Sequence, residues 1–128
     1  MNTIQIIAFT HRQFNFDEIG LFHLDDKQRI DVLTNLKTNL DIDELMYLST
    51  CNRVEFIVSH EKKITKTFVE KLIKQLLTNQ LPVNLKDIVH RAEIINSKAA
   101  VQHIFSVASS IDSLVVGERE IITQVRKA

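Results

Sequence analysis

Apolar positions recur with two different periods along the first part of the chain, and these periods predict its elements. Residues 3–9 alternate between apolar and polar side chains, which predicts a first strand. Residues 25–40 and 64–77 carry apolar side chains at three- and four-residue spacing, which predicts two amphipathic helices. Residues 14–24 have no clean period and are expected to form a loop or a short helix.

Two short apolar runs, 45–48 and 54–58, lie between the predicted helices and predict two strands joined by a tight connection. Residues 87–95 are rich in Ile and Val and predict a fourth strand. The order is then strand, helix, strand, strand, helix, strand. This order predicts an α+β fold with a ferredoxin-like split β-α-β arrangement, in which one antiparallel sheet carries its helices on one face.

The remainder of the chain predicts a C-terminal helical segment beyond the sheet. Asn96 or Ser97 can cap a helix, and another helix is expected to begin at Glu118 and to run to Ala128. This second pattern stops without a terminating Gly or Pro, so we expect a fragment of a longer protein. The apolar stripe of the first helix is formed by Ala100, Ile104, Val107 and Ile111.

Composition limits the classes of function. The 128 residues, 45% hydrophobic and 25% charged, predict one globular domain. No signal-peptide pattern and no apolar run of about 20 residues occurs, so a cytoplasmic protein without a membrane span is expected. The sixteen basic and sixteen acidic residues cancel, so any RNA contact must be local. The two glycine-rich motifs that bind nucleotide phosphates, GxGxxG and GxxxxGK, are both absent from the sequence.

The only cysteine, Cys51, lies in the predicted turn between the two central strands. A single cysteine excludes an internal disulfide and a cysteine-cluster zinc site, and it favours a reducing compartment. A thiol attacks an ester as its thiolate, which requires a nearby cation or base. Arg53 offers a planar fork for a carboxylate. His103 supplies a base if its helix packs against the hairpin.

Each of these residues also has a structural interpretation. A cysteine after a strand is often an inert small hydrophobic residue, an arginine there is often a solvated charge, and a histidine at a helix border is often only hydrogen-bonded. Periodicity and spacing therefore leave the function open. No metal is expected, because metal-ligand spacing is absent among the remaining histidines, His11, His23, His60 and His90.

Two segments resemble the N-terminal catalytic domain of glutamyl-tRNA reductase, the first committed enzyme of five-carbon tetrapyrrole (porphyrin) synthesis. Residues 48–55 (LSTCNRVE) resemble the family's active-site segment, and residues 103–118, continuing through 124–125, resemble its second signature. Residues 8–12 are a weaker match. The resemblance covers the whole chain but only about the first third of a family member. It implies that residues 1–128 form a single catalytic domain without the NADPH-binding and dimerisation domains.

The resemblance also implies an activity. Cys51 would attack the ester of glutamyl-tRNA to give a thioester, and NADPH would then reduce the thioester to glutamate-1-semialdehyde. His103 would be the second catalytic residue. Arg53 would bind a substrate carboxylate and Glu118 the ammonium group. The implied substrate-binding residues are Thr50, Asn52, Arg53, Ser113, Glu118, Glu120 and Gln124.

The implied partners are glutamyl-tRNA and the downstream semialdehyde aminotransferase, and a full-length member would be a homodimer. Two departures affect these expectations. Arg119 and Glu120 stand where the family usually has Pro and Gln, and residues 13–15 (Gln-Phe-Asn) stand where it usually has Thr-Ala-Pro. The first departure makes the contact at position 120 acidic.

Two alternatives remain open from the sequence. The first alternative to the implied activity is a non-catalytic domain of the same fold, in which Cys51 is inert and the domain binds tRNA or a protein. The second is a thiol esterase that acts on small glutamyl esters without RNA. The reactivity of the thiol separates the first alternative from catalysis.

Overall fold

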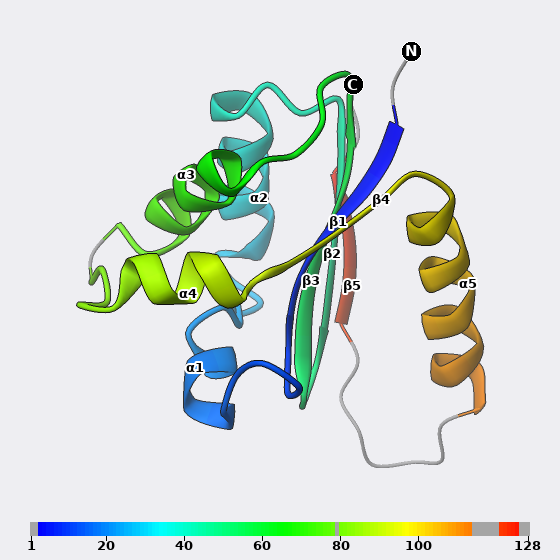
Figure 1. Cartoon of the computed structure of the whole chain (residues 1–128), viewed down its shortest axis with the longest axis horizontal. Helices are drawn as coiled ribbons and strands as arrows, with labels where there is room; N and C mark the ends of the chain where they lie inside the picture. Colours follow the sequence, from blue (N-terminus) through cyan, green and yellow to red (C-terminus); the bar gives the residue numbers. More distant parts are fainter. Residues whose placement is uncertain (1–2, 79, 114–120, 126–128) are drawn as a thin grey trace.

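The computed structural model describes residues 3–78, 80–113 and 121–125, which form one antiparallel sheet with helices on both faces (Figure 1). None of the helices in these residues is long and apolar enough to cross a membrane. The elements are β1 (Thr3–Thr10), α1 (Phe16–Gly20), α2 (Arg29–Asn39), β2 (Glu44–Thr50), β3 (Arg53–His60), α3 (Lys66–Leu76), α4 (Leu85–Arg91), β4 (Glu93–Asn96), α5 (Ser97–Ser113) and β5 (Ile121–Val125).

The five strands lie in the order β4-β1-β3-β2-β5, and every neighbouring pair is antiparallel. The expected α+β class and the single antiparallel sheet are confirmed. The predicted helices 25–40 and 64–77 correspond to α2 and α3, and residues 14–24 contain the short helix α1.

Helices α1 to α4 cover one face of the sheet and enclose the main hydrophobic core with it (Figure 1). Phe9 and Phe22 stack at the centre of this core with ring centroids 4.0 Å apart. The buried hydroxyl of Tyr47 donates to the carbonyl of Phe22 at 2.9 Å and accepts from the amide of Leu24 at 3.0 Å. Tyr47 therefore ties β2 to the connection between α1 and α2.

The two predicted helices of the sheet, α2 and α3, lie on one face as expected, whereas the C-terminal helix α5 covers the opposite face (Figure 1). It packs on β1 and β4 over a much smaller apolar cluster than the one beneath α1 to α4. The buried members of this cluster are Ile6, Ala8 and Ala100, and Ile57, Ile95 and Ile104 pack against them.

The predicted strand 87–95 is also partly wrong, since α4 occupies most of it and β4 begins only at Glu93. Ile88 and Val89 face the main core from the helix. The ammonium group of Lys66 donates to the carbonyls of Val89, His90 and Ala92, at 3.1, 3.0 and 2.5 Å. These bonds satisfy the carbonyls at the end of α4, which a helix cannot pair internally.

The helix expected from Glu118 to Ala128 is wrong within the described residues, because Ile121–Val125 is a strand that pairs with β2. Ile, Ile, Thr and Val suit a strand, and a short apolar run fits both periods equally well. The strand forms because the edge of β2 offers backbone groups with which residues 121–125 can form a ladder of hydrogen bonds.

An ion pair between Arg91 and Glu18 joins α4 to α1. Arg91 donates to both carboxylate oxygens of Glu18, at 2.9 and 2.5 Å, and lies 4.6 Å from the ring centre of Phe14. This bidentate contact lowers the pKa of Glu18 from 4.5 to about 2. A carboxyl group with a lowered pKa stabilises the fold above its unfolded pKa and loses that contribution as pH falls toward its folded pKa.

We therefore expect Glu18→Gln to lower the free energy of unfolding by about 1 kcal/mol at pH 7. The difference from the wild type should shrink as pH falls from about 4.5 to about 2. Thermal unfolding followed by circular dichroism between pH 7 and pH 2.5 measures it, with the exposed Glu61→Gln as control. A difference that does not change with pH would contradict the assigned ion pair.

Candidate active site

The β2–β3 hairpin exposes Cys51 at one end of the sheet. Only Cys51 and Asn52 lie between the two strands, and Thr50 pairs with Arg53 at the last rung of the ladder. The hydroxyl of Thr50 donates to the side-chain oxygen of Asn52 at 3.0 Å, and the carbonyl of Asn52 accepts from the amide of His11 at 3.1 Å. The turn is thus held from its own strands and from the end of β1, while Cys51 is exposed.

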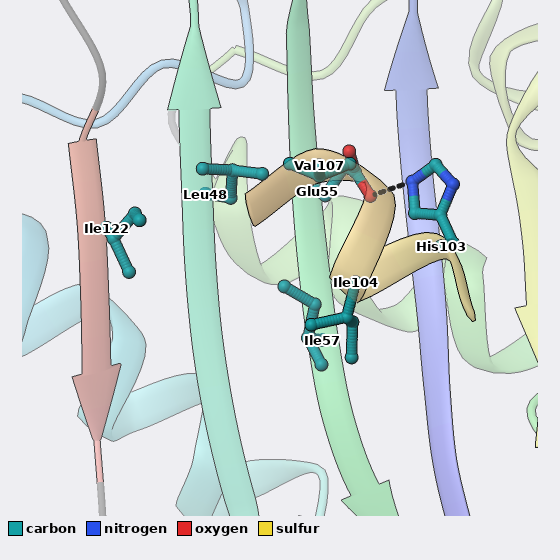
Figure 2. Close-up of a pocket in the computed structure, with 7 residues that line it drawn as sticks. All are labelled: Leu48, Glu55, Ile57, His103, Ile104, Val107 and Ile122. Atoms are coloured by element: carbon teal, nitrogen blue, oxygen red, sulfur yellow. Dashed lines mark hydrogen bonds and ion pairs between the residues drawn. The ribbon is translucent and has the colours of Figure 1, made fainter. Parts of the chain in front are cut away.

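The register of this hairpin determines which side chains share the α5 face. Leu48 pairs with Glu55, and successive residues of a strand point to opposite faces. Leu48, Glu55 and Ile57 line a pocket together with residues of α5 (Figure 2). By the same alternation, Thr50 and Arg53 belong to this face.

A buried carboxylate joins two elements on this face. Glu55 is 1% exposed, and its Oε2 lies 3.3 Å from Nη1 of Arg53. Its Oε1 lies 2.8 Å from Nε2 of His103 on α5, and the two side chains point toward each other (Figure 2). Arg53 and His103 are themselves mostly covered, with side chains 22% and 26% exposed. Glu55 therefore contacts the guanidinium through one carboxylate oxygen and the imidazole through the other.

The surroundings of this carboxylate are largely apolar. The pocket has a volume of about 70 Å³, and its lining consists of Leu48, Glu55, Ile57, His103, Ile104, Val107 and Ile122. Electrostatic interactions are stronger in such surroundings than in water. The position of His103 relative to Glu55 is therefore strongly constrained.

A second polar contact supports the hairpin from the opposite face. Ser49 is buried, and its hydroxyl lies 2.6 Å from Nδ1 of His23, which precedes α2. Burial lowers the pKa of His23. Together with the bonds of Tyr47, this contact fixes the end of β2 that leads into Cys51.

The structure brings together five of the residues expected from the sequence. Cys51, Thr50, Asn52 and Arg53 lie at the hairpin end, and Glu55 links Arg53 to His103. Sequence reasoning did not single out Glu55 as a site residue. In the pattern of β3, an acidic residue between Val54 and Phe56 is typical of the solvent face, and only the packing of α5 over it reveals its burial.

The other expected residues are placed differently. Gln124 on β5 pairs with Met46, four residues along β2 from Thr50, and belongs to the same face as Ile122. Ser113 is the last residue of α5. Glu118 and Glu120 lie outside the described residues. Among the described residues, no group of three or more His, Cys, Asp or Glu side chains is arranged to hold a metal ion.

Comparison with known proteins identifies the family. The family described as "Glutamyl-tRNAGlu reductase, N-terminal domain" matches residues 7–128. This chain belongs to that family. Proteins named glutamyl-tRNA reductase from a Nitratiruptor species and from Campylobacter hominis are each 37% identical to it over 126 residues, which is 96% and 95% of this chain. The chain spans only 28% of the length of each of these relatives.

A solved structure agrees with the fold. Glutamyl-tRNA reductase from Methanopyrus kandleri superposes on 89% of this chain and 24% of its own, with a TM-score of 0.59 and 20% sequence identity. At this identity the match supports the architecture of a glutamyl-tRNA reductase N-terminal domain and leaves the roles of individual residues to the geometry.

Proposed function

We propose that this chain is the catalytic domain of a glutamyl-tRNA reductase and that Cys51 forms a thioester with the glutamate of glutamyl-tRNA. The observation that carries the proposal is the exposed thiol at the hairpin end, two residues before an arginine whose guanidinium shares one buried carboxylate with the imidazole of His103. Membership of the family and the names of the relatives supply the substrate.

In the proposed reaction, the Cys51 sulfur attacks the carbonyl carbon of the aminoacyl ester. A carbon–sulfur bond forms, the bond from that carbon to the ribose oxygen of the tRNA breaks, and the leaving oxygen takes up a proton. His103 accepts the thiol proton or returns it to the leaving oxygen. Arg53 binds a carboxylate of the glutamyl group through its planar fork.

Reduction belongs to the longer protein. The chain contains neither the GxGxxG nor the GxxxxGK motif, so we assign no NADPH site to its residues. We place an NADPH-binding domain and a dimerisation domain in the part of the enzyme that this chain does not span. There, a hydride from NADPH would convert the thioester to glutamate-1-semialdehyde for tetrapyrrole synthesis.

The finer assignments extend the same proposal. Thr50, Asn52, Ser113, Glu118, Glu120 and Gln124 are proposed to contact the substrate, in a cytoplasmic homodimer that passes its product to the semialdehyde aminotransferase. The strand order β4-β1-β3-β2 supports a ferredoxin-like arrangement of the first four strands, with β5 added at the edge.

The central test is the covalent adduct. Incubation with glutamyl-tRNA labelled in its glutamate should give an acid-stable, hydroxylamine-sensitive adduct on the wild-type chain and none on Cys51→Ala, which has no nucleophilic atom at this position. Gel analysis after acid quenching measures it. Absence of the adduct from the wild type, or an equal adduct on Cys51→Ala, would refute thioester formation on this residue.

Further measurements on the same chain separate the alternatives. An interaction domain with an inert cysteine should bind glutamyl-tRNA without any adduct, and its thiol should alkylate slowly near neutral pH. An esterase unrelated to tRNA should acylate equally well with small glutamyl esters.

Arg53→Lys should raise the substrate concentration needed for half-maximal acylation by about 10- to 100-fold, because a point charge replaces a bidentate contact. Acylation rates measured over a range of glutamyl-tRNA concentrations test it. Arg29→Lys, on the helix α2 of the opposite face, is the matched control. An unchanged half-saturation in Arg53→Lys would remove Arg53 from the substrate site.

A further inference from the structure

Glu55 has no assigned role, yet its geometry is more specific than that of a structural ion pair. It is 1% exposed, it is the third residue of β3, and each carboxylate oxygen contacts a different polar side chain. We infer that Glu55 is a positioning residue that fixes which nitrogen of His103 carries the proton and orients the guanidinium of Arg53 for thioester formation. The inference rests on the proposed function.

The hydrogen-bond inventory of these three groups leaves one arrangement. An ionised carboxylate only accepts hydrogen bonds, and a guanidinium only donates them. When Glu55 is ionised, its Oε1, 2.8 Å from Nε2 of His103, can only accept, so that nitrogen carries the proton. In the neutral imidazole, Nδ1 is then unprotonated and is the nitrogen that can accept a proton.

This arrangement assigns separate tasks to the two ring nitrogens. Nε2 is held by the buried carboxylate, and Nδ1 remains available as the base toward the thiol or the leaving oxygen. A carboxylate that holds a catalytic imidazole in one tautomer is a known device in nucleophilic catalysis, and losing the correct tautomer slows such enzymes severely even when the geometry is intact.

Replacement of Glu55 by glutamine makes the inference testable, because an amide has one oxygen and one NH₂ group. The oxygen must accept from Arg53, which can only donate, so the NH₂ group faces Nε2 of His103. Nε2 must then become an acceptor, and the proton moves to Nδ1. Glu55→Gln should therefore reverse the tautomer while leaving Arg53 bonded and able to bind glutamate.

The experiment combines two readouts on the complete 128-residue chain. Nitrogen-15 NMR at a pH where the imidazole is neutral reports the tautomer of His103, and the His103→Asn spectrum assigns its signals among those of the five histidines. Acylation by labelled glutamyl-tRNA reports the maximal rate and the half-saturating concentration. Thermal unfolding reports whether each variant is folded.

We expect Nε2–H in the wild type and Nδ1–H in Glu55→Gln. The maximal acylation rate of Glu55→Gln should fall about 100-fold or more, the usual contribution of a positioned base, with less than about a threefold change in half-saturation. Glu55→Asp, which keeps an acceptor-only group, should retain Nε2–H and recover part of the rate. Glu93→Gln, an exposed acid on β4 of the same sheet, should behave as the wild type.

Each contrary outcome is decisive. A wild-type His103 protonated at Nδ1 overturns the inference without any variant, which also covers the case in which Glu55→Gln does not fold. A folded Glu55→Gln that acylates at the wild-type rate, or that loses rate with its tautomer unchanged, overturns it as well. If the wild type forms no adduct, the proposed function fails, and the NMR result alone decides whether Glu55 positions His103.

Discussion

The pairing register of β2 with β3 is the constraint on which the site depends. Because Thr50 pairs with Arg53, the turn contains two residues and Cys51 is one of them. A shift of one residue would move every side chain of a strand to the opposite face. Arg53 and Glu55 would then point into the main core, away from His103. The hairpin thus presents the thiol and selects the charged groups near it.

The two faces of the sheet differ in their packing, since one carries the main core and the other the candidate site. The face beneath α1 to α4 carries the large aromatic and aliphatic core, and Tyr47 and Ser49 anchor β2 to it by hydrogen bonds. Among the described residues, the face beneath α5 carries a small apolar cluster next to the Glu55 pocket. A scaffold that is rigid on one side can hold the strands of the site in place while its other side accommodates polar groups.

The elements whose pattern lies within their own segment were predicted from the sequence, whereas the elements that depend on residues far away in the chain were not. The hairpin around Cys51 and the helices α2 and α3 follow from patterns within each segment. The end of α4 depends on Lys66, more than twenty residues earlier, and β5 depends on the free edge of β2. Neither dependence appears as a period in the segment concerned, so both were assigned to the wrong element. The candidate site shows the same division, since Cys51 and Arg53 are close in sequence, whereas Arg53 is linked to His103 through Glu55, 48 residues before His103 in the chain.

Stability alone does not account for such a bridge. A buried ion pair loses hydration on both partners, and apolar residues of similar volume are often as stable or more stable in its place. In the part of the α5 face that the structure describes, the buried apolar cluster is small, and a leucine at position 55 would add apolar surface there. The chain instead carries a carboxylate that is 1% exposed and satisfied on both oxygens, within the hairpin that presents its only cysteine. A buried carboxylate that bridges the guanidinium of Arg53 and the imidazole of His103 is consistent with the proposed role of Cys51 as a nucleophile.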